Sequence, residues 1–221
     1  MPVKQLLESC KAIQLKPKLS EEEMREFQGS LPGPIPTDIE ELLRYSSGFK
    51  INSIEVDFTG RSYRFEFKEL VPYGVPVAKT EEGNFWVVDV GENGIWSSLF
   101  HISFDPPILL VQYSTLEGFV EAALSGQLAA TREFLRTKGA YSAGILADQA
   151  RNSPDSVIAQ FAQSLPSNSR IFDLRGDTVP QGFEWGSAGP RSMCKRFGCE
   201  LIFATEEPTA RKGLLSRLLA K

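Results

Sequence analysis

Residues 54–67 alternate between apolar and polar side chains with a period of two, which is the spacing of β-strands. Apolar residues alternate with charged ones in 54–58 and again in 63–67, and Thr59-Gly60-Arg61-Ser62 stands between the two runs. This pattern predicts a β-hairpin with aromatic side chains on one face and charges on the other. We therefore expect an antiparallel sheet with one side facing water.

Two further apolar segments predict strands at the centre of the same sheet. Residues 84–90 carry apolar side chains on both faces, and residues 108–111 are apolar throughout. A strand that is apolar on both faces is typical of one that is buried on both sides.

Helices are predicted before and after these strands. Apolar residues at helical spacing predict an amphipathic helix over residues 3–13. Ser/Thr-x-x-Glu pairs have the spacing of a capping box, in which each side chain accepts a hydrogen bond from a backbone N–H group that the first helical turn leaves unpaired. They predict helices over about 20–29, from 37 to about 45, and over 116–124; the pairs are Ser20–Glu23, Thr37–Glu40 and Ser114–Glu117. We expect Gly48 and Gly126 to close the last two in a left-handed conformation.

The chain after residue 126 has a different composition. Ser153-Pro154 predicts the start of a helix, and residues 170–174 and 200–204 are short strand candidates. Between them, residues 176–198 are rich in glycine and proline and predict a long loop. Residues 208–220 predict a basic amphipathic helix with Leu214, Leu215, Leu218 and Leu219 on one face. This helix could lie on an acidic membrane surface, enter a partner's groove, or pack its leucines on the protein's own core.

Charge is divided unevenly along the chain. The net charge is −4, and it arises from an acidic segment, 1–125, and a basic one, 126–221. An acidic surface would attract a basic partner and repel nucleic acid. Residues 1–17 contain no apolar run of signal-peptide length, and no run is long enough to span a membrane. We therefore expect a cytoplasmic protein without an integral membrane segment, and the three cysteines do not predict a disulfide framework.

Residues that could carry catalysis are few. The single histidine, His101, lies in an apolar strand, where a structural role is expected. Cys194 and Cys199 have no second cysteine pair or histidine nearby, so a closed zinc site is not predicted. Asp89 and Asp105 could form a carboxylate pair, but no nucleophile accompanies them. No nucleotide-binding motif follows a strand, and we expect no catalytic residue, cofactor or metal site.

Residues 35–49, Ile-Pro-Thr-Asp-Ile-Glu-Glu-Leu-Leu-Arg-Tyr-Ser-Ser-Gly-Phe, resemble the opening motif of the SUKH superfamily. This superfamily includes fungal cell-wall assembly regulators, bacterial immunity proteins and the SecY-interacting protein Syd. Residues 83–90 are similar to the family's Gly-x-hydrophobic-Asp strand, and residues 99–107 are similar to its later strand ending near Asp-Pro. The resemblance covers about residues 18–126. Two positions depart from the family's pattern, since Ser47 stands where asparagine is common and Phe104 where histidine is common.

The resemblance implies an α+β fold, in which a central, mostly antiparallel twisted sheet is flanked by helices. We expect a SUKH-like domain with its N-terminal helix over residues 1–139. An α/β extension or small second subdomain would then occupy 140–221. Neither the resemblance nor the composition predicts an oligomeric state.

The resemblance also implies a non-enzymatic protein-binding module, of the type of an immunity protein that neutralises a toxin, often a basic nuclease. Acidic side chains on the wet face of the sheet would speed association with such a partner. The expected partner-binding residues, chosen by outward strand position or by position in a loop, are Glu55, Asp57, Glu66, Glu69, Glu81, Glu82 and Glu92.

Two alternatives remain at the level of sequence. The first is a regulatory scaffold, like the cell-wall regulators or Syd, that binds host machinery instead of a toxin. The second is an enzyme with a site in the C-terminal glycine- and proline-rich segment, around Trp185 and Arg191.

Overall fold

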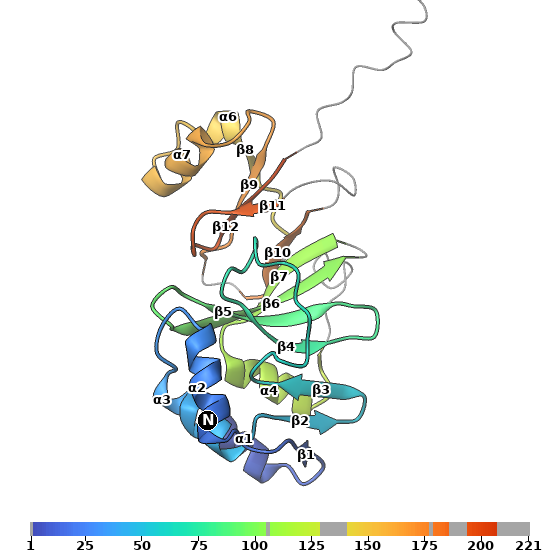
Figure 1. The fold of residues 1–221 in the computed structure, drawn as a ribbon. Coiled ribbons are helices and arrows are strands. Elements are labelled where there is room, and N and C mark those ends of the chain that lie inside the picture. Colours follow the sequence, from blue (N-terminus) through green and yellow to red (C-terminus); the bar gives the residue numbers. More distant parts are fainter. Residues whose placement is uncertain (1, 105–106, 129–140, 177–178, 186–193, 207–221) are drawn as a thin grey trace, which may run out of the picture.

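The computed structural model describes residues 2–104, 107–128, 141–176, 179–185 and 194–206. These residues build two antiparallel sheets, one of eight strands and one of four. Helices cover the outer face of each sheet, so that the elements stack as helices, large sheet, small sheet and helices (Figure 1). The protein therefore has an α+β fold with a central antiparallel sheet, as the sequence predicts.

The large sheet has the strand order β1-β2-β3-β4-β5-β6-β7-β10. From β2 to β7, strands that follow one another in the chain are also neighbours in the sheet, as in a meander. All six residues of β5 are buried, which confirms the expected central strand at 84–90. The strands are β1 (Gln14–Leu15), β2 (Gly48–Ile51), β3 (Ile54–Asp57), β4 (Val75–Lys79), β5 (Phe85–Val90), β6 (Trp96–Phe104), β7 (Pro107–Tyr113) and β10 (Gln181–Glu184).

One face of the large sheet is covered by four helices (Figure 1): α1 (Val3–Ser9), α2 (Glu21–Ser30), α3 (Thr37–Tyr45) and α4 (Leu116–Leu124). Apolar side chains of these helices form one core with residues of the sheet such as Trp86, Val88 and Leu99. The helix expected over 3–13 ends at Ser9, and the helix expected over 116–124 has the predicted bounds.

The small sheet has the order β11-β12-β9-β8 and lies against the other face of the large sheet. Its strands are β8 (Ile145–Leu146), β9 (Arg170–Asp173), β11 (Cys194–Arg196) and β12 (Ile202–Thr205). Phe172 and Phe203 enter the core between the two sheets, whereas their neighbours Ile171 and Ile202 face α6 (Ala147–Ala150) and α7 (Ser156–Gln163). Strands near 170–174 and 200–204 are thus confirmed.

Strand β10 connects the C-terminal part of the chain to the large sheet. It pairs with β7, and the loop expected over 176–198 is therefore wrong where β10 and β11 lie. A Cβ on Gly182 would be 2.2 Å from the carbonyl oxygen of Leu109, so glycine is required for this approach. The boundary expected near residue 139 does not separate the two sheets, because the later segment supplies a strand to the first sheet.

The hairpin expected over 54–67 is wrong. Strand β3 pairs with β2 and β4, and residues 63–67 form no strand. The physical reason is the carboxylate of Asp57, which accepts hydrogen bonds from the backbone N–H groups of Thr59 and Ser62 and turns the chain away from the sheet. The aromatic residues that follow pack on the core between the sheets instead.

Helix ends confirm one of the expected capping boxes. Both hydrogen bonds of the Ser20–Glu23 pair are present. The Thr37–Glu40 box is wrong, because α3 begins after Pro36 and no side chain caps it. The Ser114–Glu117 box is also wrong, because Thr115 is the residue that caps α4. Gly126 has φ 71° and follows α4 as expected.

Two other expected helix ends fall at different residues. Gly48 begins β2 instead of closing α3. Glycine is needed at this position because a Cβ would lie 2.1 Å from the carbonyl oxygen of Val56. The helix expected to open at Ser153-Pro154 begins at Ser156, where the carboxylate of Asp155 accepts two backbone N–H groups.

A buried ion pair joins the small sheet to the large one. The guanidinium of Arg196, on β11, donates to both carboxylate oxygens of Asp89, on β5, at 2.8 and 2.7 Å. The exposed fractions of the two side chains are 1% and 8%. Arg196 also lies over the rings of Phe100 and Phe203 and donates to the carbonyl oxygen of Glu200. One side chain therefore bonds to residues of both sheets.

We predict that removing either member of this ion pair destabilises the whole fold. Asp89→Asn or Arg196→Met leaves a buried polar or charged group without its partner, which costs about 3–5 kcal/mol in comparable buried pairs. The free energy of unfolding, measured in urea, should fall by that order. The double variant Asp89→Leu/Arg196→Met should be more stable than either single variant, because no charge is then left buried.

The matched control is Glu66→Gln, which breaks the exposed Arg64–Glu66 pair. A surface pair of this kind contributes at most about 1 kcal/mol. Equal losses for Asp89→Asn and Glu66→Gln would contradict a special role for the buried pair.

Candidate functional site

The seven acidic residues expected to bind a partner do not come together on one face. Glu55 is held between two ammonium groups, at 2.7 Å from Lys16 and 2.8 Å from Lys50. Hydrogen bonds from Lys16 and Lys50 lower the pKa of Glu55. Its negative charge is therefore already compensated within the protein.

Asp57 is buried, with an exposed fraction of 5%, although strand parity suggests an outward position. Burial alone would raise the pKa of its carboxyl group, but hydrogen bonds from Ser62 and Thr59 outweigh burial, and the pKa is lowered. This carboxylate fixes the loop after β3 and has little surface to offer a partner.

The remaining five residues lie in separate places. Glu66 pairs with the exposed Arg64, and Glu69 lies in the loop before β4. Glu81 and Glu82 are exposed in the turn between β4 and β5, and Glu92 is exposed in the turn between β5 and β6. These two turns are at opposite ends of β5, so the structure does not join their charges into one surface.

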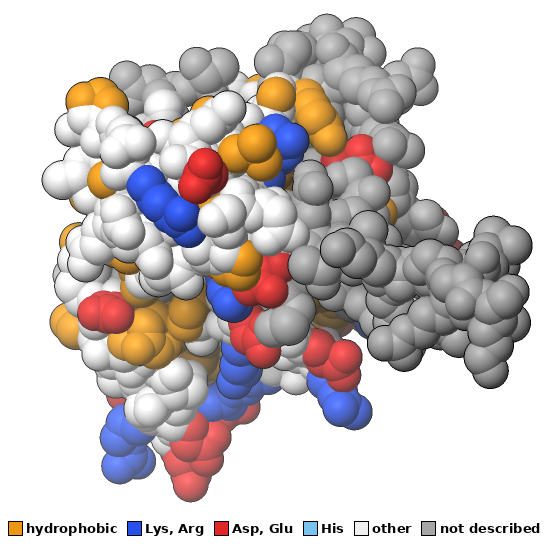
Figure 2. Space-filling model, turned by 90° about the horizontal axis from the view of Figure 1, so that it is seen from above, with side chains coloured by type: hydrophobic (Ala, Val, Ile, Leu, Met, Phe, Trp, Pro, Cys, Tyr) orange, Lys and Arg blue, Asp and Glu red, His pale blue; other side chains and the backbone are white. Residues whose placement is uncertain are grey.

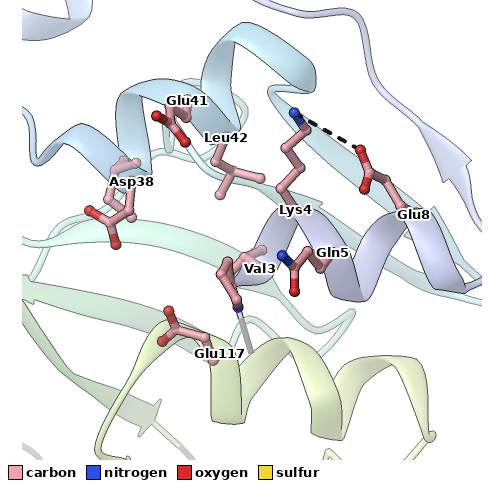
Figure 3. Close-up of a pocket in the computed structure, with 10 residues that line it drawn as sticks. Val3, Lys4, Gln5, Glu8, Asp38, Glu41, Leu42 and Glu117 are labelled. Atoms are coloured by element: carbon pink, nitrogen blue, oxygen red, sulfur yellow. Dashed lines mark ion pairs between the residues drawn. The ribbon is translucent and has the colours of Figure 1, made fainter.

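A different acidic site lies where α1, α3 and α4 meet. A pocket of about 300 Å³ opens between them (Figure 3), and a second pocket of about 250 Å³ lies beside it, toward the start of β6. The two pockets share Asp38, Ile39 and Glu117 and are here called the acidic groove. Its lining consists of Pro2, Val3, Lys4, Gln5, Glu8, Pro36, Asp38, Ile39, Glu41, Leu42, Ile95, Trp96, Ser97, Ser114, Thr115, Leu116 and Glu117.

Local helix geometry explains why acidic side chains surround an apolar floor. In α3, Ile39 and Leu42 are buried in the core that the helices share with the large sheet, while Asp38 and Glu41 are exposed on the neighbouring positions. Asp38 and Glu117 each lie in the first turn of their helix, where an acidic residue interacts favourably with the helix dipole. Figure 3 shows both carboxyl groups pointing toward the same opening.

The charge of the groove is only partly compensated. Among its described lining residues Lys4 is the one Lys or Arg, and its Nζ lies 4.0 Å from the carboxylate of Glu8 on the next turn of α1. In the described part of the chain, no ion pair involves Asp38, Glu41 or Glu117. An unpaired cluster of carboxylates at the mouth of a pocket raises the local concentration of cations and basic groups.

An apolar contact surface adjoins these carboxylates. Ile95, in the turn between β5 and β6, has an exposed fraction of 59%, the largest among the exposed large hydrophobic residues described. Trp96 lies next to it in the groove. On the face seen from above in Figure 2, by contrast, acidic, basic and hydrophobic side chains are interspersed over the described residues. The acidic groove therefore combines an apolar anchor position with mostly negative charge.

Asp38, Glu41 and Glu117 are not among the residues predicted from the sequence. Each occupies a polar position of an amphipathic helix, and such positions ordinarily face solvent without any binding role. Asp38 and Glu117 are nearly 80 residues apart in the chain, and their proximity depends on how α3 and α4 each pack beside α1. A local sequence pattern does not reveal that packing. The sequence shows only that residues 1–125 are acidic overall.

Other candidate groups for chemistry have structural partners. Asp89 binds Arg196. Asp105 and Arg191 lie outside the described residues. Burial raises the pKa of the Cys194 thiol, which disfavours the reactive thiolate. Across the residues that the structure describes, no group of three or more His, Cys, Asp or Glu residues could hold a metal ion. The helices in that part of the chain are also too short or too polar to cross a membrane.

Comparisons of the chain with family models, with curated proteins and with solved structures found no match.

His101, the only histidine, is buried in β6 beside Trp86, with ring centroids 4.9 Å apart. Burial lowers its pKa from 6.5 to about 4, so the imidazole is neutral at pH 7. Trp86 in turn donates from Nε1 to Gln112. This environment is that of a packed core residue, in agreement with the structural role expected from the sequence.

We predict that His101 makes stability depend on pH between about 6.5 and 4. In this range the unfolded chain binds a proton that the folded protein excludes, so stability falls as the pH falls. At about 1.4 kcal/mol per pKa unit, wild type should lose roughly 3 kcal/mol more than His101→Phe between pH 7 and pH 4.

Urea unfolding of both proteins at several pH values measures this difference. Carboxylates such as Asp57 titrate in both proteins and cancel in the comparison. A difference that stays constant over the whole range would show that His101 does not titrate as described.

Proposed function

We propose that this protein is a non-enzymatic protein-binding module and that a basic segment of its partner binds in the acidic groove. The observation that carries this proposal is the group of carboxylates at Asp38, Glu41 and Glu117, which have no ion pair in the described structure and line a groove whose lining is partly apolar. Lysine or arginine side chains would complete their hydrogen bonds. Their aliphatic stems would cover the apolar floor, as long basic side chains do.

The resemblance to the SUKH superfamily supports a more specific proposal, in which the protein acts as an immunity protein. The partner would then be a toxin, and a nuclease with a basic surface fits the charge of the groove. Nucleic acid itself fits poorly, because carboxylates repel phosphates. Cytoplasmic action follows from the same proposal, since the protein would meet a toxin inside the cell it protects.

Ile95 supplies the apolar part of the proposed interface. Interfaces bind chiefly through a few apolar or aromatic anchors, and charges at the rim steer association. Ile95 is largely exposed and adjoins Trp96, so a partner could bury both without any rearrangement of the protein.

The first test reverses the charge of the groove. Asp38→Lys/Glu117→Lys should slow association with the partner by about tenfold or more at low salt, as electrostatic steering predicts. The matched control is Glu66→Lys/Glu81→Lys, which makes the same change of charge at exposed positions outside the groove.

The partner is first captured from a lysate of the native cells with wild type as bait. Binding rates of wild type and both variants are then measured with the purified partner, after circular dichroism has verified folding. Equal slowing by both variants would mean that overall charge, and not the groove, attracts the partner. Slowing by the control alone would favour the acidic residues predicted from the sequence.

The second test removes the anchor without changing charge. Ile95→Ser should increase the dissociation rate of the complex, with little change in association rate or in thermal stability, because this side chain is mostly exposed before binding. Leu15→Ser, which removes an exposed apolar side chain on β1 outside the groove, serves as the matched control. An unchanged dissociation rate for Ile95→Ser would exclude this edge of the groove from the interface.

A further inference from the structure

A second hollow lies at the edge of the small sheet, away from the acidic groove. Its volume is about 590 Å³. Its apolar floor consists of Phe161 in α7, Leu165 in the turn after α7, and Phe197 directly after β11. The full lining is Glu69, Phe161, Ser164, Leu165, Cys194, Lys195, Arg196 and Phe197.

The hollow lies where the helical cover of the small sheet is incomplete. The residues of α6 and α7 form a core with Ile171, Ile202 and Ala204, on β9 and β12. Strand β11 is the edge strand beyond β12, and its Lys195 side chain is exposed. One more amphipathic segment beside α7 would therefore complete this layer.

The chain itself supplies such a segment at the right place. Glu206 is the last described residue, and its carboxylate pairs with Lys195 Nζ at 2.6 Å, on the lining of the hollow. Residues 207–221 follow directly. Leu214 is eight residues beyond Glu206, and a chain of that length reaches at most about 29 Å, so the hollow is well within range.

The chemistry of this segment also fits. Leu214, Leu215, Leu218 and Leu219 share one face at helical spacing, and the other positions include Arg211, Lys212 and Arg217. At the rim of the hollow, the carboxylate of Glu69 is exposed and has no ion pair in the described structure. A leucine face toward Phe161 and Leu165 would thus bring basic residues near an unpaired acid.

We propose that residues 208–220 dock in this hollow of their own chain as an amphipathic helix, with the leucines against Phe161, Leu165 and Phe197. The C-terminal segment is then a third helix over the small sheet. A free arm for a membrane or for another protein would not bury these leucines within the same molecule.

Disulfide trapping tests the proposed contact. In the full chain with its native cysteines replaced (Cys10→Ser, Cys194→Ala, Cys199→Ser), Ser164→Cys is combined with Leu218→Cys, on the leucine face. The matched control combines Ser164→Cys with Ser216→Cys, on the opposite face of the same helix. We expect the first pair to form an intramolecular disulfide at least fivefold faster than the control, at a rate independent of protein concentration.

Equal rates for the two pairs would overturn the proposal, because a free arm brings both faces to Ser164 equally often. A crosslink that joins two chains and forms faster at higher concentration would overturn it in favour of docking on a second copy.

Hydrogen exchange of the unmodified protein gives an independent readout that does not depend on replacing Cys194. The amides of α7 should exchange several-fold more slowly in wild type than in the full-length variant Leu214→Asp/Leu218→Asp. The same exchange in both proteins would contradict docking, as would slower exchange that appears only when anionic vesicles are added.

Discussion

The ion pair between Arg196 and Asp89 is the interaction on which the arrangement of the two sheets depends. Strand β11 is an edge strand of the small sheet and β5 is a central strand of the large one, so this contact crosses the interface between the sheets. Two buried charges are costly unless each is fully paired. The pair meets this condition with two direct hydrogen bonds, with backbone carbonyl oxygens that accept the other N–H groups of Arg196, and with two aromatic rings beside the guanidinium. These bonds fix the position of Arg196 on β11 relative to Asp89 on β5.

The two sheets carry separate outer layers of helices. On the small sheet, α6 and α7 close a core and leave the hollow in which we propose that the C-terminal segment docks. On the large sheet, α1, α3 and α4 rest on a rigid support and hold the acidic groove at their ends. A surface on rigid elements loses little conformational entropy on binding, so charge and an exposed anchor suffice for the proposed interaction. The acidic residues that are already paired, such as Glu55, stabilise the fold and contribute little to the proposed interface.

The sequence predicts many of the helices and strands of this fold. It predicts less well which of them pair or pack with one another. Periodicity correctly indicates the strands at β5 and β7 and the helix α4, because apolar spacing follows directly from which faces are buried. The hairpin at 54–67 fails because Asp57 binds backbone N–H groups of the next turn, a hydrogen bond that an alternating pattern cannot reveal. The loop predicted over 176–198 fails where β10 lies. A glycine-rich stretch is typical of a loop, but Gly182 is needed there for close pairing with β7. The acidic groove depends on packing between helices far apart in the chain, and only its overall charge could be anticipated.

Hydrogen exchange of the full-length protein, alone and with its captured partner bound, tests the proposed interface most directly. We expect binding to slow exchange in the first turns of α3 and α4, in α1 and in the turn that contains Ile95. Exchange in the turn between β4 and β5, which holds Glu81 and Glu82, should not change. Slower exchange in that turn or around Glu55, with none at the starts of α3 and α4, would contradict the acidic groove as the binding site.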